Sequence, residues 1–441
     1  MSQENPKHLE DIINLKSIQK SPIRNSVPNI TINEPPPEMC FDCKGTKLLC
    51  GKSRCPILVK AESLTRVSKD IKSNNISGST PPGIFVGRYG YPKVSIGPMT
   101  PNYHGDTEIL DTPEQWYGKS IDEIVDYRHS LIRGSTNIDI NDASKGGRLV
   151  ENLQELSMTS KPVELELKLT KKPQNRLSFN ENSQPFGPSA PLDSFTFGTV
   201  SVDQRIEKAY YDHDLKASDG IIDLYDKGVL VSRIQKTLSA GTLGLGNNRK
   251  FVPTRWSITA VDDLLSKNLI SKIKDFPTID DFRVYVLQNL DNLYVTILLP
   301  TSWQFEWIEA WFPNTTWNLW GSEPYMIGDQ ESYHGRKKYA RVGGCYYSTR
   351  LAVTESLLKE RKQAGAILLR EIHPGYILPV GVWNVRESIR QQLKTNYKSF
   401  DNLSDSLQFA FSQLTIKKQN WMNSSYLLNQ VLFQRRLTEY L

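Results

Sequence analysis

The chain contains 441 residues, of which 38% are hydrophobic and 10% aromatic, and it carries a net charge of +6 at pH 7. This composition excludes a fully disordered chain and predicts two or three globular domains with apolar cores. An apolar run of roughly eighteen residues is absent, and so is a basic N-terminal segment leading into an apolar stretch, which excludes a membrane span and a signal peptide. We therefore expect a cytoplasmic protein whose mild positive charge permits contact with phosphate without requiring it.

Residues 1–38 are rich in Asn, Ser, Pro and charged side chains and end in a run of prolines. Such a segment buries too little apolar surface to fold alone, so it is predicted to be a disordered leader. We assign no function to it.

Four of the five cysteines fall within sixteen residues, in the pattern C-x2-C, six residues, C-x4-C. Gly45 and Gly51 follow two of these cysteines, where a chain that folds around a metal needs positive φ. A closed set of four thiolates leaves no position for a catalytic water, so residues 39–58 are predicted to hold a structural zinc ion. Disulfide bonds and an iron cluster are the alternatives. The predicted ligands are Cys40, Cys43, Cys50 and Cys55.

Residues 59–160 are predicted to form an N-terminal α+β domain. Short strands are expected at 84–87 and 93–97, joined by a turn, and a helix at 112–130. His104 and Asp106 lie on a loop where a base and its carboxylate partner could act, although hydrogen bonding within the loop is the more ordinary interpretation.

Residues 161–192 combine a polar, strand-like run with a stretch rich in Pro, Asn and Ser, and we predict that they link two domains. The second domain, residues 193–415, is also expected to be α+β. Its strands are predicted from 195, at 283–287 and 293–299, and at 364–372, and its helices before 238, at 346–363 and at 383–393. A tail at 416–441 completes the chain. The fold class predicted for the whole protein is α+β.

The segment 241–263 combines glycines, cations and hydroxyl groups, which is what a phosphate-binding loop requires. It matches neither the P-loop nor the dinucleotide fingerprint, so an ordinary glycine-rich connection is the alternative. Thr259 is a candidate helix N-cap with Asp262 three residues later. Asp262 and Asp263 are candidate acid or metal-binding residues, and helix N-terminal stabilisation is the alternative. The candidate phosphate-binding residues are Arg249, Lys250, Thr254, Arg255 and Ser257.

A tryptophan-rich stretch precedes a polar cluster that contains Asp329, Glu331 and His334. Aromatic rings among cations suit stacking on unpaired bases. The spacing of Trp303, Trp307 and Trp311 instead favours a buried stripe along one face of a helix. Cys345 stands apart from the other cysteines and is interpreted as a buried structural residue, with a nucleophilic thiol as the alternative.

The last eight residues fit the pattern by which replication and repair proteins bind sliding clamps. A glutamine is followed by an aliphatic residue three positions later, and then by an aromatic and an apolar residue. One 3₁₀ turn would place the apolar members on one face, while the glutamine amide binds backbone in a neighbouring pocket. An amphipathic last helical turn is the alternative. The predicted clamp-binding residues are Gln434, Leu437, Tyr440 and Leu441.

With these residues in view, the chain resembles the archaeal NreA-type DNA repair family. The resemblance rests on the four-cysteine segment, residues 85–98, residues 252–263, Gly343-Gly344-Cys345-Tyr346-Tyr347 and the terminal clamp motif. It implies a role in surviving DNA damage, a four-cysteine zinc finger, and binding of the archaeal sliding clamp (PCNA) through the PIP-type motif at 434–441. It implies no catalytic activity.

These observations favour a zinc-containing DNA repair protein that a sliding clamp brings to DNA. An enzyme that acts on a nucleotide or nucleic-acid phosphate through residues 241–263 is the first alternative. A non-catalytic DNA-binding adaptor is the second. The sequence does not decide whether the protein is an enzyme.

Overall fold

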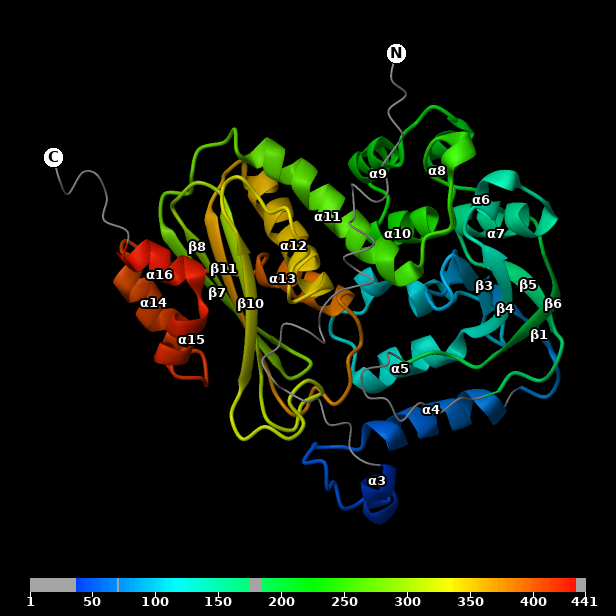
Figure 1. The fold of residues 1–441 in the computed structure, drawn as a ribbon, viewed down its shortest axis with the longest axis horizontal. Coiled ribbons are helices and arrows are strands. Elements are labelled where there is room, and N and C mark those ends of the chain that lie inside the picture. The colour runs from blue at the N-terminus through cyan, green and yellow to red at the C-terminus, as the bar shows by residue number, and fades with distance from the viewer. Residues whose placement is uncertain (1–36, 70, 175–184, 434–441) are drawn as a thin grey trace. The chain divides into compact units, whose positions relative to one another are not determined.

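The computed structural model describes residues 37–69, 71–174 and 185–433 (Figure 1). They divide into two compact units, with the boundary inside helix α11 (Thr254–Ile273) between Leu265 and Ser266. The N-terminal unit contains the described residues from Pro56 to Leu265. The C-terminal unit contains those from Ser266 onward together with the cysteine segment up to Cys55. Each unit holds a sheet and several helices, which confirms the α+β class.

The sheet of the N-terminal unit has six strands in the order β1-β5-β6-β4-β3-β2. Neighbouring strands are antiparallel except β4 and β6, which run parallel. The strands are β1 (Asn75–Thr80), β2 (Ile84–Val86), β3 (Lys93–Thr100), β4 (Ile132–Asp139), β5 (Val163–Leu169) and β6 (Ser189–Phe197). Strands β2 and β3 confirm the two strands predicted here.

Helices of the N-terminal unit include α4 (Pro56–Lys69), α5 (Ile121–Ser130), α7 (Arg148–Met158) and α10 (Val231–Ser239). Shorter elements are α6 (Asp142–Lys145), α8 (Gln204–Tyr211), α9 (Ala217–Asp226) and the 3₁₀ turns η1 (Glu108–Asp111), η2 (Pro113–Gln115) and η3 (Gly246–Asn248). Apolar residues of α7 join those of the sheet in one core, because Val150, Leu153 and Leu156 recur at helical spacing.

The helix predicted at 112–130 begins later than expected. Gly118 adopts a φ of 82°, which ends the preceding 3₁₀ turns, and Ser120 then caps α5. Its side chain accepts from the Glu123 amide at 3.2 Å, while the Glu123 carboxylate accepts from the Ser120 amide at 2.9 Å. This capping box fixes the start of α5 at Ile121.

The polar stretch predicted as a linker at 161–192 contains β5 and the start of β6, which pair with each other in the sheet. In β5 every second residue is buried, so its Val and Leu side chains join the core while its Glu and Lys side chains face away. Alternation of this kind places a strand with polar content inside a domain. The change of unit occurs within α11 instead.

The sheet of the C-terminal unit has six strands in the order β10-β9-β11-β8-β7-β12. Only β9 and β11 run parallel. Leu290 and Asp291 take positive φ in the turn between β7 and β8, as a tight hairpin requires. The strands are β7 (Phe282–Asn289), β8 (Asn292–Leu299), β9 (Gln304–Trp311), β10 (Tyr325–Glu331), β11 (Gly365–Ile372) and β12 (Lys398–Phe400).

Helices cover both faces of this second sheet (Figure 1). Helices α12 (Gly344–Glu360) and α13 (Trp383–Gln392) pack on one face. Helices α14 (Leu403–Ser412), α15 (Lys418–Ser424) and α16 (Tyr426–Phe433) pack on the other. The predicted strands at 283–287, 293–299 and 364–372 and the helices at 346–363 and 383–393 are confirmed here.

The tryptophan stripe is buried, as predicted, but Trp307 and Trp311 lie on strand β9 and Trp303 immediately precedes it, so the stripe is not on a helix. Trp303, Trp307 and Trp311 are at most 5% exposed. Residues four apart share a face in a strand as well as in a helix, so the spacing alone did not separate the two. Burial of these rings leaves them unable to stack on bases.

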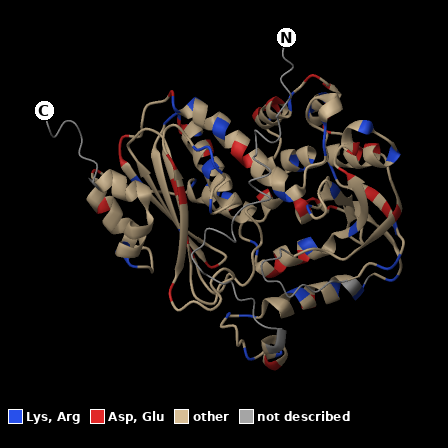
Figure 2. Cartoon of the chain, viewed as in Figure 1, with Lys and Arg blue, Asp and Glu red and all other residues tan. Residues whose placement is uncertain are grey.

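Charge is not segregated between the two units. Lysine and arginine positions are interspersed with acidic positions along the elements of both (Figure 2). Any recognition of phosphate by the described residues therefore depends on a local cluster rather than on an extended basic face.

We expect Trp307→Ala to lower the free energy of unfolding by about 3–5 kcal/mol, because it leaves a large cavity in the core. Trp320→Ala is the matched control, since that ring is 45% exposed, and it should change stability by less than about 1 kcal/mol. Urea denaturation followed by far-UV circular dichroism measures both. Equal losses for the two variants would contradict the buried position of Trp307.

Candidate functional site

The cysteine segment forms a knuckle around Cys43. Helix α3 (Pro37–Cys43) carries the first two cysteines. The Lys44 amide donates to the Cys40 carbonyl at 2.9 Å, and the Thr46 amide donates to the Cys43 carbonyl at 3.1 Å. Gly45 and Gly51 adopt φ of 73° and 72°, so positive φ occurs where the sequence predicted it.

Backbone amides converge on the Cys43 sulfur. The pKa of this thiol lies below its ordinary value, chiefly because the Leu49 amide donates to it. Burial works in the opposite direction, and the amides of Gly45, Leu48 and Lys47 reinforce the lowering. Amides arranged in this way stabilise a thiolate, which is the form that binds metal.

None of the five cysteines, all of which are described, forms a disulfide bond, so the disulfide alternative finds no support. Within the described ranges, no three His, Cys, Asp or Glu side chains come together in an arrangement that could hold a metal ion. The knuckle around Cys43 is thus formed, while the other three thiols are not gathered around it.

The C-terminal unit anchors this cysteine segment. Lys52, only 2% exposed, donates from Nζ to the Asn314 carbonyl at 3.4 Å. A Cβ at Gly51 would lie 2.4 Å from the Asn314 side chain, and the φ of 72° there also disfavours any residue other than glycine. Ser53 Oγ donates to the Pro374 carbonyl at 3.4 Å. These contacts hold the segment against the loops that follow β9 and β11.

The candidate phosphate loop uses its polar groups within the chain. Arg249 is buried, donates from Nε to the Gly244 carbonyl at 2.9 Å, and stacks over the Tyr210 ring at 4.7 Å. Thr254 Oγ1 accepts from the Val86 amide at 3.0 Å. Ser257 Oγ donates to the Thr254 carbonyl at 2.9 Å. Lys250 and Arg255 are exposed. Three of the five groups thus close the loop and start α11.

Thr259 does not cap a helix, because α11 already begins at Thr254 and Thr259 lies inside it. Asp262 and Asp263 follow within the same helix, and both are buried. Asp262 Oδ1 accepts from Gln235 Nε2 of α10 at 3.0 Å. Asp262 thus links α11 to α10, and because both carboxylates are buried they do not form an open acidic site.

The polar cluster after the tryptophans is a set of ion pairs. Glu331 accepts from Trp303 Nε1 at 3.1 Å and from Arg350 Nη1 at 2.6 Å, deep in the core. Asp329 pairs with Arg336 at 2.7 Å. Burial raises the pKa of Asp329, but hydrogen bonds from Arg336 and the Arg341 amide outweigh it and leave the pKa below its ordinary value.

His104 and Asp106 do not form the suggested pair. His104 Nδ1 contacts the Glu164 carboxylate of β5, and its Nε2 lies 3.3 Å from Ser77 Oγ. Asp106 Oδ1 accepts from the Glu108 amide at 3.2 Å, which is the local loop bond anticipated as the alternative. Burial raises the pKa of the Cys345 thiol, so Cys345 is unsuited to act as a nucleophile.

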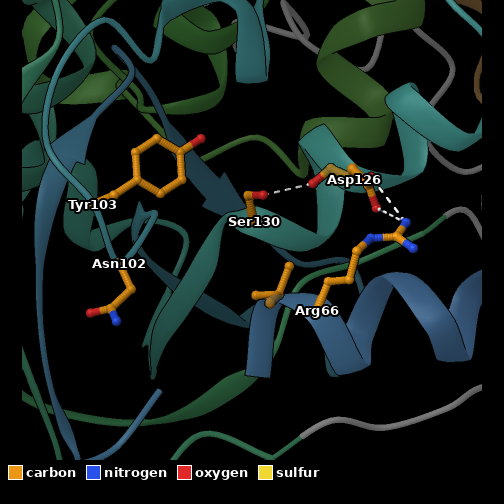
Figure 3. A pocket seen from close by; sticks show the side chains of 6 residues that line it. Arg66, Asn102, Tyr103, Asp126 and Ser130 are labelled. Carbon is orange, nitrogen blue, oxygen red and sulfur yellow. Dashed lines mark hydrogen bonds and ion pairs between the residues drawn. The ribbon is translucent and has the colours of Figure 1, made fainter. Parts of the chain in front are cut away.

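A cavity of about 250 Å³ lies between α4, α5 and the loop after β3. Arg66 donates to both Asp126 oxygens, at 2.7 and 3.0 Å, and Ser130 Oγ donates to the Asp126 carbonyl at 2.8 Å (Figure 3). Burial raises the pKa of Tyr103, which keeps its phenol protonated. Asn102 and Val67 complete the lining. The sequence predicted His104 as the candidate residue of this loop, but the neighbouring Tyr103 is the residue that lines the cavity.

Residues 434–441, which carry the predicted clamp motif, lie outside the described residues. The helix before them, α16, is firmly seated. The Glu306 carboxylate of β9 accepts from the Tyr426 amide at 2.7 Å, the Leu427 amide at 3.3 Å and the Ser425 hydroxyl. A buried carboxylate thus caps the helix that leads to Gln434.

Two family models match the chain. "Archaeal Nre, N-terminal" matches residues 49–318, and "Archaeal Nre, C-terminal" matches residues 331–440. The chain belongs to the archaeal Nre family. This confirms the resemblance, and the Nre match continues through most of the terminal octapeptide.

Curated Nre relatives align over most of their lengths. The chain is 44% identical to DNA repair protein NreB of Archaeoglobus fulgidus, over 91% of this chain and 100% of the relative. It is 35% identical to DNA repair protein NreA of the same organism, over 86% and 94%. It is 34% identical to DNA repair protein NreA of Haloferax volcanii, over 78% and 84%. No solved structure matches. None of the described helices is both long and apolar enough to cross a membrane.

His129, in the last turn of α5, makes stability depend on pH. It is 2% exposed, with Nδ1 2.9 Å from Ser63 Oγ. Burial, foremost, lowers its pKa from 6.5 to about 4. As pH falls from 6.5 to 4, the unfolded chain binds a proton that the folded chain resists, so stability is lost across that window.

We therefore expect His129→Gln to reduce the loss of unfolding free energy between pH 6.5 and 4 by roughly 2–3 kcal/mol. The exposed His334→Gln is the control and should follow the parent chain. Urea midpoints measured across this pH range test the difference. A parent-like profile for His129→Gln would show that this histidine is not the titrating group.

Proposed function

We propose that this chain acts in DNA repair and that a PCNA-type sliding clamp recruits it to DNA through Gln434, Leu437, Tyr440 and Leu441. Family membership carries the first part, because the aligned relatives bear the name DNA repair protein and the chain covers at least 84% of each. The terminal octapeptide carries the second part, since its residue types and spacing fit the clamp pocket.

The described structure supports recruitment through the position of α16. Glu306 lies on a central strand of the C-terminal sheet and fixes the first turn of this helix. Leu427 and Leu428 are buried against the sheet. The motif follows directly after Phe433, the last residue of the helix. A peptide joined to a seated helix by so short a connection brings the folded body close to the clamp, which raises its local concentration at DNA.

Removing the clamp motif should abolish clamp binding and leave the fold intact. We expect a chain that ends at Phe433, and the double variant Tyr440→Ala, Leu441→Ala, to bind the clamp about a hundredfold more weakly or worse. Thr438→Ala, inside the octapeptide but outside the pattern, is the matched control and should bind like the parent. Isothermal titration calorimetry with the clamp measures all four chains. Undiminished affinity after truncation would refute clamp recruitment through this motif.

We further propose that Cys40, Cys43, Cys50 and Cys55 hold a structural zinc ion. The donor set is four thiols in one short segment, none of them in a disulfide bond, and the amides around Cys43 favour its thiolate. Zinc bound by four protein thiolates would close the segment and supply no catalytic position. Its proposed role is to stabilise the segment that Lys52 and Ser53 attach to the C-terminal unit.

The intact chain should copurify with about one zinc ion per molecule, and Cys43→Ser should lose most of it. Cys345→Ser is the matched control, since that thiol lies far along the sequence and has a raised pKa. Metal content by inductively coupled plasma mass spectrometry gives the answer without an activity assay. Zinc retained in Cys43→Ser, or absent from the parent chain, would exclude the proposed site.

A further inference from the structure

Two arginines of the N-terminal unit lie close together without a carboxylate hydrogen-bonded to either guanidinium among the described residues. Arg133 of β4 lies 4.4 Å from the ring centroid of Phe85 and 4.3 Å from that of Phe186, and these two rings meet edge to face with their centroids 6.0 Å apart. Arg128, in the last turn of α5, lies 4.9 Å over the Trp116 ring. Both guanidinium groups thus gain cation–π contacts, while no described carboxylate accepts from their N–H donors.

The neighbouring acid is already engaged. Asp111 Oδ2 pairs with Lys236 Nζ at 2.8 Å, and both side chains are about one-tenth exposed. Asp111 is also the acid that acts electrostatically on Arg128 and Arg133. Asp111 also acts on a fourth cation, Arg233, which has Asp203 and Glu108 as further acidic neighbours. Arg128 and Arg133 therefore share a carboxylate that is already paired, and together these two arginines are only partly compensated.

The pKa values of the two arginines are consistent with this incomplete charge compensation. Burial, foremost, lowers the pKa of Arg133, and the nearby Arg128 lowers it further. Burial also lowers the pKa of Arg128. Both residues are half-buried rather than fully enclosed. An anion placed between the guanidinium groups would relieve their mutual repulsion.

Close backbone packing builds the cluster. A Cβ at Gly187 would lie 2.1 Å from the Leu131 carbonyl oxygen, so only glycine allows the segment carrying Phe186 to approach β4. The Arg133 amide donates to the Pro188 carbonyl at 2.9 Å, and Arg133 is paired in register with Ser189. These contacts place Phe186 beside Arg133, and its ring remains 45% exposed.

A structural role explains only part of the arrangement. A cation at the end of α5 is favoured by the helix dipole, and stacking stabilises both arginines. An uncharged side chain could pack against Phe85 and Phe186 without the cost of burying a charge. Two adjacent, weakly compensated guanidinium groups instead match an oxyanion that accepts several hydrogen bonds.

We propose that Arg128 and Arg133 bind the phosphate of a nucleotide unit, with the exposed ring of Phe186 as the stacking surface for its base. A free nucleotide and a nucleotide within a single DNA strand share this chemistry. The site would give the proposed repair protein its own contact with DNA. It does not depend on the clamp or on the terminal octapeptide.

The test is fluorescence anisotropy of the full chain with a labelled single-stranded oligothymidylate, in the absence of clamp. AMP and inorganic phosphate serve as competitors. We expect Arg128→Gln and Arg133→Gln each to weaken binding about tenfold or more, because each loses charged hydrogen bonds. Arg148→Gln removes the same charge from an exposed position of the same unit and should change the affinity less than about twofold. Phe186→Ala should weaken binding of the oligonucleotide and of AMP without affecting inorganic phosphate.

Thermal unfolding of Arg133→Met separates a ligand site from a structural one. A ligand site predicts an unchanged or raised melting temperature together with lost binding, because a buried charge is replaced by an apolar side chain. A melting temperature lowered in step with binding would overturn the proposal, and so would parent-like affinity in both glutamine variants or no binding by the parent chain. Competition by inorganic phosphate alone would exclude the nucleotide.

Effective competition by AMP would identify a free nucleotide as ligand, and binding of the strand without such competition would identify DNA. Since the clamp is absent throughout, these outcomes are independent of clamp recruitment. A negative result for the arginine site would therefore leave clamp recruitment untouched, and a negative result for clamp recruitment would leave the arginine site untouched.

Discussion

Buried carboxylates with dedicated partners are the constraint on which the C-terminal unit depends. Glu309 of β9 pairs with Arg370 of β11 at 2.9 Å on the face that carries Trp307, while Glu306 caps α16 on the opposite face. Glu371 of β11 accepts from the amides of Thr415 and Ile416. Because successive strand residues face opposite sides, a shift of one residue would exchange these acids between two cores and leave each without its donors. The register of the sheet and the seating of its last helices therefore depend on the same few side chains.

Periodicity in the sequence predicted most strands and the long helices, because each has one face that must be buried. Periodicity gave the wrong element where the same spacing fits both a helix and a strand. Tryptophans four apart satisfy both a helix and a strand, and only the pairing of β9 with β10 and β11 decides between them. It also failed at β5, where polar content suggested a linker although every second residue is buried. The start of α11 was placed too late because Pro253-Thr254 begins the helix ahead of the candidate cap at Thr259.

Site residues were predictable when their chemistry was local. Gly45 and Gly51 take the expected conformations because a knuckle of backbone is a short-range structure. Sequence could not show that the Arg249 guanidinium contacts Gly244 and Tyr210, since the loop closes on itself through contacts that composition does not encode. The reverse holds for Phe85, Arg133 and Phe186. Nothing in their separate surroundings marks them, and they meet only because β2, β4 and the segment before β6 converge in one sheet.

During synthesis, Glu306 leaves the ribosome well before the helix that it caps. Its amide donor at Tyr426 lies 120 residues further along the chain. A ribosome that adds roughly 5–20 residues per second needs on the order of ten seconds to cover that distance. In that interval β7, β8, β9 and β11 can pair, but the sheet face later covered by α14, α15 and α16 is still bare and includes an uncapped acid. Nascent chains of this protein thus pass through a stage with an exposed apolar sheet face, at which binding by a chaperone would matter more than at any point after release.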